Sequence, residues 1–394
     1  MFQLNTQIKI SCLFSLFLAC FSGLIGINLC YADNTGVTNQ QVVIGQSCGL
    51  TGPAKEMGVK LSAGMDAYFA KVNAAGGING RQIKLITKDD GYEPNRAYSN
   101  TLALIDQDKV FLLIGETGTP TSKAVLPLVE KYKIPFLTPY SGARLLRQLD
   151  SNLVINLRGS YHREIEKIAV YLTGKEHLNL KRVACFYQND SYGLDGLNGV
   201  KAVLKERGMK MVAAGSYERN TMDVDNALAA IYKAKPEAVI MIGTAKPSAK
   251  FIKLSKEKGL KNVVFANVSF VGEGALRNEL GSEGDGVIVS EIVPYPWDNS
   301  MPVVKEYADA MKKYAPQENL GFTSLEGFLD AKLFCQILSS LKEVTRENFM
   351  AAVKKQKHFD LGGVEYEYGK GDNEGINYVL LTVLKNGKSE PLLP

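Results

Sequence analysis

The sequence predicts an α/β protein with two lobes, each a doubly wound parallel sheet with helices on both faces. Two observations lead to this fold class. Short apolar runs alternate with amphipathic helical stretches almost from end to end, which is the pattern of parallel sheets covered by helices. The chain also has 394 residues, whereas a single hydrophobic core stops growing at about 250–300 residues.

The strand candidates are continuous apolar runs, as expected for strands that are buried on both faces. They are VVIG (42–45), QIKLIT (82–87), FLLIG (111–115), RVACFY (182–187), AVIMIG (238–243) and VVFA (263–266). Between them, apolar residues recur at helical spacing. These stripes run from 61 to 72, from 197 to 204 and from 304 to 314, and each ends near a glycine or a proline.

The amino-terminal segment predicts export. Lys9 precedes an apolar run over Ile10–Leu29, and Cys30-Tyr31-Ala32 places small residues three before and one before a cut. We therefore expect residues 1–32 to be a signal peptide that is cleaved after Ala32, and the protein to be periplasmic. An uncleaved membrane anchor and a lipoprotein modified at Cys20 are the alternatives.

Charge and cysteine content exclude several classes of protein. A net charge of +5, spread along the chain, gives no basis for binding nucleic acid or anionic membrane. Beyond the expected signal, Cys48, Cys185 and Cys335 remain, and their spacing fits no metal site. Cys185 and Cys335 lie in apolar runs and are expected in the core, whereas Cys48 lies on a glycine-rich loop. An odd number of cysteines does not build a disulfide scaffold.

The loops that follow the strands are the candidate binding site, because ligands collect at the carboxyl ends of parallel strands. The loop after 111–115 contains Thr117, Gly118 and Thr119. Thr119 is a candidate N-cap with Pro120 at the first helical position. A helix start can bind a carboxylate or a phosphate, although an ordinary capped helix would show the same residues.

Other strand ends are also small and polar. They are residues 46–53, 140–143, 188–193, 244–245 and 267–269, and they supply hydroxyls, amides and aromatic rings that suit hydrogen-bonded capture of a small molecule. Taken singly, each is a common turn.

Enzyme signatures fail when they are tested. No Gly-x-Gly-x-x-Gly follows the first strand, no phosphate loop is complete, and the histidines have no metal-ligand spacing. Asp89-Asp90 could be a paired carboxylate, but a capping role is favoured because no nucleophile accompanies it. The sequence therefore predicts no catalytic residue, no metal and no cofactor.

A family resemblance covers nearly the whole expected mature chain. It rests on ordered segments that include VVIGQSCGLTGP, AGGINGRQIKLITKDDGYEP, LIGETGTPT, IPFLTPYSGARLL, VINLRGSYHREIEKIAVYL and SLEGFLDAKLFCQIL. In these the chain resembles the leucine/isoleucine/valine-binding type of periplasmic binding protein, the solute receptor of ABC importers.

The resemblance implies two lobes joined by three crossover segments. We expect the crossings near 156–160, 287–294 and 358–363. Lobe 1 would then be 38–157 plus 291–357, and lobe 2 would be 160–287 plus 363–394. The partners implied are a small carboxylate or amino acid and a permease of the inner membrane.

The resemblance also implies the ligand contacts. Thr119 matches the hydroxyl that holds the ligand carboxylate, and Tyr192 matches a tyrosine of lobe 2 that closes over the ligand. Met57 falls where the family has an aromatic wall. Ser269 falls where the family has the acid that grips the ligand ammonium, so an acid without an amine is as well supported as an amino acid. The full set of expected contacts is Met57, Thr117, Gly118, Thr119, Tyr140, Ser141, Gly142, Tyr192, Thr244 and Ser269.

Two other functions compete with solute delivery. A sensory module of the same fold would pass its ligand signal to a membrane kinase or chemoreceptor. A dehydrogenase-type enzyme would need a nucleotide-binding glycine turn, which the first strand lacks.

Overall fold

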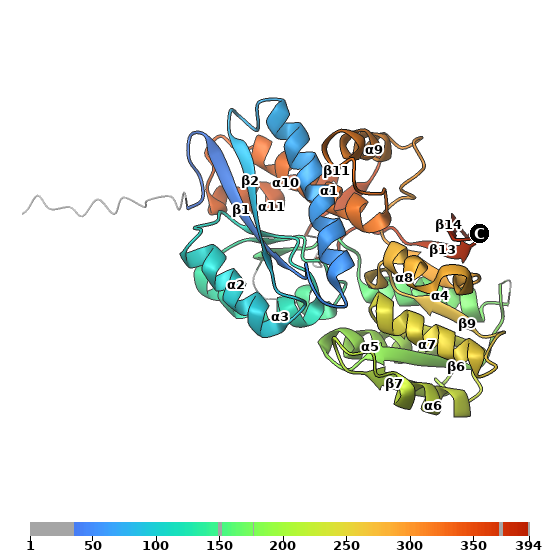
Figure 1. Ribbon diagram of the computed structural model, residues 1–394. Helices are drawn as coiled ribbons and strands as arrows, with labels where there is room; N and C mark the ends of the chain where they lie inside the picture. The colour runs from blue at the N-terminus through green and yellow to red at the C-terminus, as the bar shows by residue number, and fades with distance from the viewer. Residues whose placement is uncertain (1–34, 149–151, 176, 370–372, 393–394) are drawn as a thin grey trace, which may run out of the picture. The chain divides into compact units, whose positions relative to one another are not determined.

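A computed structural model describes residues 35–148, 152–175, 177–369 and 373–392, and it contains two large sheets (Figure 1). The first sheet has the strand order β2-β1-β3-β4-β5, and all its pairings are parallel. Its strands are β1 (Gln41–Cys48), β2 (Gln82–Asp89), β3 (Leu113–Ile114), β4 (Phe136–Leu137) and β5 (Val154–Ile155).

The second sheet has the order β14-β13-β10-β9-β8-β6-β7. The strands from β10 to β7 pair in parallel, and β13 and β14 extend the sheet in antiparallel fashion. These strands are β6 (Val183–Gln188), β7 (Ala213–Tyr217), β8 (Ala238–Ile242), β9 (Val264–Asn267), β10 (Ile288–Glu291), β13 (Leu380–Lys385) and β14 (Lys388–Pro391).

Helices cover both faces of each sheet (Figure 1). On the first sheet, α1 packs against α9 and α10, and α2 packs against α3. On the second sheet, α4 packs against α5 and α7 against α8. The helices of the first group are α1 (Lys55–Ala74), α2 (Pro94–Asp106), α3 (Thr119–Tyr132), α9 (Pro302–Tyr314), α10 (Phe322–Ser339) and α11 (Arg346–Gln356). Those of the second are α4 (Tyr161–Thr173), α5 (Ser191–Glu206), α6 (Asp225–Lys233), α7 (Ala245–Glu257) and α8 (Glu273–Leu280).

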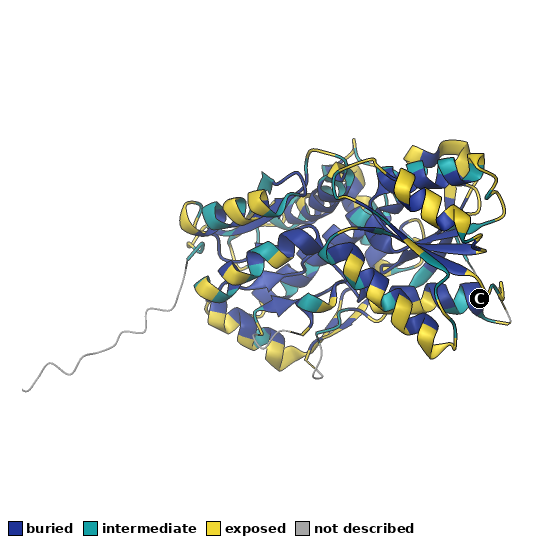
Figure 2. Ribbon diagram, turned by 90° about the horizontal axis from the view of Figure 1, so that it is seen from below, coloured by how far each residue is buried: buried dark blue, intermediate teal, exposed yellow. Residues whose placement is uncertain are grey.

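Burial follows the apolar pattern of the sequence (Figure 2). Val42 and Ile44 of β1 are fully buried, and so are all five residues of β8. In α1 the stripe of Leu61, Met65 and Phe69 faces the core. The predicted fold class, an α/β protein with parallel-sheet lobes, is confirmed. We call the first sheet with its helices lobe 1 and the second sheet with its helices lobe 2.

The chain passes more than once between the two sheets, and two of these passages run side by side. Ile376 donates its backbone N–H to Leu157, and Asn373 hydrogen-bonds to Asn156 and Val154. The hairpin of β11 (His358–Asp360) and β12 (Glu365–Glu367) is instead tied to the helices of lobe 1, through Gly362 to α9 and Asp360 to α10. We therefore propose that the third crossing follows β12, later than the expected 358–363.

The expected signal peptide, residues 1–32, lies outside the described residues. Within the described part of the chain, no helix combines the length and the apolar character needed to cross a bilayer.

Candidate functional site

The loops after β3 and β4 lie side by side, because these strands are neighbours in the first sheet. Gly118 donates its N–H to Tyr140 O at 3.1 Å, and Tyr140 donates to Glu116 O at 2.9 Å. At the meeting point the hydroxyls of Thr119 and Ser141 are 2.7 Å apart and hydrogen-bonded, and both residues are fully buried. Thr119 and Ser141, which were both predicted to contact the ligand, thus form one polar cluster.

The start of α3 differs from the expectation in one respect. Thr119 is the first helical residue and not the N-cap, which is Gly118, and no side chain caps this helix end. Gly118 has φ +106°, and a Cβ there would lie 2.2 Å from the Tyr92 ring. The Thr119 hydroxyl is therefore directed to Ser141, and the first-turn amides keep their capacity to bind an anion.

Tyr161 approaches this cluster from the start of α4. Its N–H donates to Gly142 O at 2.9 Å, and a Cβ on Gly142 would collide with its ring. The Tyr161 hydroxyl lies beside Thr119 and Ser141, and no hydrogen-bond partner of good geometry satisfies it. Burial raises the pKa of Tyr161 to about 12. Buried polar atoms of this kind are normally paired, so the Tyr161 hydroxyl keeps hydrogen-bonding capacity that a ligand can use.

An aromatic group closes the space between the lobes. The ring of Phe270 lies 4.6 Å from Tyr192, 5.5 Å from Tyr140, 6.0 Å from Tyr92 and 6.2 Å from Tyr161, measured between ring centroids. All five residues are at most 1% exposed. Lobe 1 supplies Tyr92 and Tyr140, and lobe 2 supplies the other three, so the lobes are in contact at this point.

Thr244 lies in a hydrogen-bonded chain that belongs to lobe 2. It precedes α7, and its N–H donates to the Tyr217 hydroxyl at 2.9 Å. Tyr217 donates to Gln188, and the Gln188 amide reaches the Tyr92 hydroxyl of lobe 1 at 3.2 Å. The hydroxyl of Tyr192 donates a hydrogen bond to the backbone carbonyl of Gly243, the residue before Thr244, at 3.4 Å.

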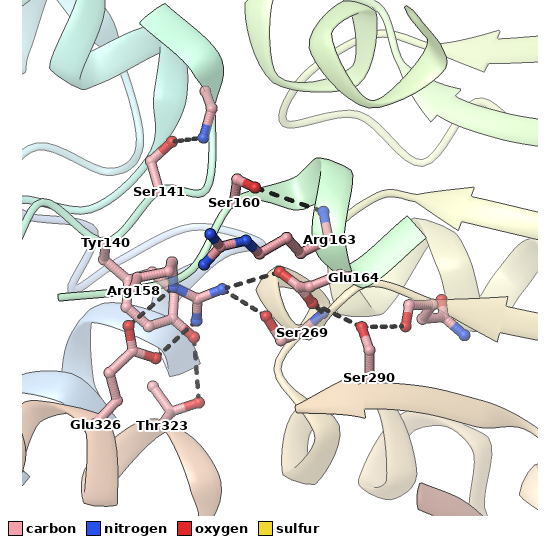
Figure 3. Close-up of polar contacts among 12 residues, drawn as sticks. Tyr140, Ser141, Arg158, Ser160, Arg163, Glu164, Ser269, Ser290, Thr323 and Glu326 are labelled. Atoms are coloured by element: carbon pink, nitrogen blue, oxygen red, sulfur yellow. Dashed lines mark hydrogen bonds and ion pairs between the residues drawn. The ribbon is translucent and has the colours of Figure 1, made fainter. Parts of the chain in front are cut away.

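A buried guanidinium lies beside Ser269 (Figure 3). Arg158 donates from Nη1 to the Ser269 hydroxyl, and from Nε and Nη2 to both carboxylate oxygens of Glu326 at 2.9 and 2.7 Å. Its guanidinium carbon stands 4.1 Å from the centre of the Tyr140 ring. Burial acts to lower the pKa of Arg158, but Glu326, Tyr140 and Glu164 outweigh it and hold the pKa well above its usual value. The Ser269 hydroxyl thus accepts a hydrogen bond from a positively charged side chain of the protein itself.

Further buried carboxyl groups surround Arg158. Glu164 accepts hydrogen bonds from the Ser269 N–H and the Ser290 hydroxyl, and its other oxygen lies 3.8 Å from Arg158 (Figure 3). Glu291 and Asp330 each keep one buried oxygen without a partner. Burial raises the pKa of Glu164, and it raises the pKa of Glu291 and of Asp330 well above the ordinary range. Burial thus favours the neutral form of Glu291 and Asp330.

Met57 lies in a different part of the space between the lobes. It lines a cavity of about 720 Å³ together with residues of α8, β14, the start of α10 and the segment after β10. Thr323 also lines this cavity, and its hydroxyl is 3.5 Å from that of Tyr140. Tyr140, which precedes Ser141 in the chain, thus connects the cavity wall to the loop that carries the polar cluster.

Other acidic and sulfur-containing candidates have structural roles. Glu116 is fully buried and accepts a hydrogen bond from the Thr101 hydroxyl of α2 at 2.8 Å. Asp89 and Asp90 both accept backbone N–H groups, at Gly91 and Tyr92, as a capping role requires. Cys48 is buried, and burial raises its thiol pKa to about 12, which makes it inert. Cys185 and Cys335 are also buried and unpaired.

At the rim, lobe 1 and lobe 2 are joined by charged groups. Glu93 accepts from Arg219 at 2.9 Å and from Asn220 at 2.6 Å, and Arg219 also lies 3.5 Å from Asp190. These contacts are accessible to water and salt, in contrast to the buried Arg158 group.

Sequence reasoning missed the residues at the centre of the site. Tyr92, Arg158, Tyr161 and Phe270 each adjoin a predicted contact along the chain or in space, but no role was assigned to them. Arg158 and Tyr161 belong to the NLRGSY segment that carried part of the family resemblance, and this was the available signal. Over the described residues, no cluster of acidic, histidine or cysteine side chains is arranged to hold a metal ion.

Comparison with known proteins identifies the class. The sequence model of the periplasmic binding protein family matches residues 41–389, and the chain belongs to this family. The Leu/Ile/Val-binding protein homolog 7 of Brucella suis biovar 1 is 25% identical over 334 residues, which are 81% of this chain and 80% of that protein.

Solved structures agree. A possible leucine/isoleucine/valine-binding protein from Rhodopirellula baltica SH 1 has 34% identity and a TM-score of 0.85, over 92% of this chain and 98% of the other. A branched-chain amino acid ABC transporter protein from Thermus thermophilus, with bound valine, has 20% identity and a TM-score of 0.80, over 91% and 96% of the chains, and shows the shared fold.

Proposed function

We propose that the protein is the extracytoplasmic receptor of an ABC importer. It captures a small carboxylate or amino-acid-like solute between its lobes and delivers it to an inner-membrane permease, without chemical change to the solute. The observation that carries this proposal is the buried Thr119–Ser141 pair at the uncapped start of α3. The names of two relatives, a Leu/Ile/Val-binding protein homolog and a possible leucine/isoleucine/valine-binding protein, support it.

The polar cluster favours a carboxylate. Hydroxyls from Thr119, Ser141 and Tyr161 converge there, and the helix start adds backbone N–H groups and a positive dipole end. A neutral solute would use the hydroxyls but gain nothing from the dipole. A carboxylate gains from both, because hydrogen bonds to a charged acceptor are about twice as strong as neutral ones.

The surroundings of Ser269 argue against an ammonium grip at that residue. Its hydroxyl accepts from Arg158, and its N–H is already donated to Glu164. An ammonium placed on this hydroxyl would meet a guanidinium of the same charge at close range. We therefore propose that the solute is held chiefly through its carboxylate.

Thr119→Ala tests the carboxylate contact. A charge-assisted hydrogen bond contributes roughly 1.5–3 kcal/mol, so affinity should fall by about tenfold to a hundredfold. Suitable probes are L-leucine, L-phenylalanine and the same two acids without the amine, 4-methylpentanoate and 3-phenylpropanoate. Calorimetric titration of the refolded, ligand-free protein at 25 °C gives the affinities.

Thr345→Ala is the matched control. Thr345 caps α11 by accepting from the Asn348 N–H at 3.0 Å, far along the chain from the cluster. Its loss should lower stability by about 1 kcal/mol and leave affinity unchanged. Equal affinities for the wild type and Thr119→Ala would remove Thr119 from the site. Binding of none of the four probes would contradict the proposed solute class.

We also propose that export is completed by cleavage after Ala32. The small residues of Cys30-Tyr31-Ala32 and the apolar run before them support this. Amino-terminal sequencing of the protein recovered from the periplasm of a Gram-negative host should begin at Asp33. Recovery of a chain that begins at Met1 in the membrane fraction would contradict cleavage.

A further inference from the structure

The chain contains a single tryptophan, and Trp297 lies on the wall of the 720 Å³ cavity. Its ring is 4.9 Å from Tyr295 and 5.8 Å from Phe322, with interplanar angles of 60° and 87°. Edge-to-face packing of this kind leaves ring faces uncovered, and Trp297 is 38% exposed. Met57 and Gly272 line the same cavity. Tyr295, Trp297 and Phe322 therefore form an aromatic wall of this cavity, which lies between the lobes.

The size and position of this cavity suit part of a small ligand. Ligand cavities typically measure about 300–1,000 Å³. Residues of both lobes line this one, with α1 and the start of α10 on one side and α8 and β14 on the other. A molecule held there would contact both lobes at once. Thr323 on the cavity wall contacts the hydroxyl of Tyr140, the residue that directly precedes Ser141 of the Thr119–Ser141 cluster.

Two of the cations on the cavity wall are paired with an acid, and Glu56 and Lys388 are further charged residues that line it. Lys60 is paired with Glu318, and Arg277 donates to Glu273 at 2.8 Å. Ions that are already paired offer little to a second ion. One buried polar atom remains without a partner, the hydroxyl of Ser389, and it can hydrogen-bond to a polar substituent on a ring.

We propose that this cavity receives an aromatic ring of the solute, so that the transported compound is an aromatic carboxylic acid. The inference rests on the proposed function, which supplies the carboxylate at Thr119 and Ser141. The ring lies against Trp297 and Phe322, and the side chain that joins ring and carboxylate passes Tyr140. Trp297 and Phe322 are the residues that set the preference for a ring.

The four probes named above form two matched pairs that differ only in the ring. L-phenylalanine is compared with L-leucine, and 3-phenylpropanoate with 4-methylpentanoate. We expect the tighter-binding aromatic compound to bind at least tenfold more tightly than its aliphatic counterpart. Because Trp297 is the sole tryptophan, its emission should also change on saturation with the aromatic compound. Equal affinity within both pairs would overturn the inference.

Variants assign the effect to the wall. Calorimetric titration of Trp297→Ala should show an affinity for the aromatic compound that is at least tenfold lower and an unchanged affinity for its aliphatic counterpart. Phe322→Leu keeps the fluorophore and should act in the same direction. Tyr232→Ala, at an exposed aromatic residue of α6, should have no effect.

The outcomes separate the two proposals. If Thr119→Ala weakens every probe but Trp297→Ala weakens none, the aromatic inference fails and the proposed function stands. If no probe binds to the wild type, the proposed solute class fails and the inference fails with it.

Discussion

Replacing Glu326 with glutamine is expected to lower the free energy of unfolding by roughly 3–5 kcal/mol, the usual effect of breaking a buried ion pair. Glu326 binds Arg158 through both carboxylate oxygens, and the two side chains are only 4% and 2% exposed. The substitution leaves the guanidinium buried with its main counter-charge removed and places an amide N–H against an arginine N–H. Urea unfolding at pH 7 measures the change.

An exposed ion pair provides the matched control. Lys305 and Asp309 are 2.9 Å apart on α9, with both side chains about two-thirds exposed. Asp309→Asn should therefore change stability by less than about 1 kcal/mol. If Glu326→Gln were as mild as this control, Arg158 would have to find compensation from Glu164 or from water, and the buried pair would not be the main tie between the crossover segment and α10.

A second large effect is expected from pH acting on Glu116. Burial is the main cause that raises the pKa of Glu116 to about 8 from its ordinary 4.5, against the hydrogen bond from Thr101. The folded protein therefore keeps a proton that the unfolded chain loses. The contribution of protonated Glu116 to the free energy of unfolding is therefore complete below pH 4.5, and it is lost as the pH rises to about 8. At 1.36 kcal/mol for each pKa unit, the loss is roughly 3–5 kcal/mol.

The substitution Glu116→Gln removes the titrating carboxyl group and keeps the size and shape of the side chain. The free energy of unfolding of wild type and variant, measured in urea at pH 5 and pH 9, should differ in pH dependence by that amount, with the wild type losing more. Other buried carboxyl groups such as Asp90, whose pKa burial raises to about 6, titrate in both proteins and cancel. Glu206→Gln, at an exposed residue of α5, should match the wild type. Parallel pH profiles for wild type and Glu116→Gln would contradict the assignment.

Local sequence pattern predicted the strands and the strand-end loops that carry the site, but it did not predict the residues at which the two lobes meet. The long strands β1, β6 and β8 contain continuous apolar runs, and β2 mixes apolar and polar residues; these patterns were enough to find all four strands. Strands β4 and β5 have two residues each, which is too short for any periodic signal. Thr119 and Ser141 could be brought together in advance because carboxyl ends of adjacent parallel strands meet at one edge.

The remaining residues depend on how the lobes meet. Phe270 follows a predicted contact directly, yet nothing local indicates that its ring lies among four tyrosines from distant segments. Arg158 lies on a crossover segment and finds its acid in α10, 168 residues away. Such pairings follow from tertiary packing, which local sequence pattern does not specify. The N-cap assignment of Thr119 was wrong because Gly118 adopts a backbone conformation that shifts the helix start by one residue.

The ring of Phe270 has a consequence for measured affinities. The Phe270 ring lies 5.5 Å from that of Tyr140, so we expect a solute that passes Tyr140 from the Thr119–Ser141 pair to compete with Phe270 for the same volume. The observed dissociation constant is then the intrinsic constant divided by the fraction of molecules in which the ring has moved aside. The free energy that holds the Phe270 ring among the tyrosines would then be subtracted from the free energy that the solute gains by its own contacts.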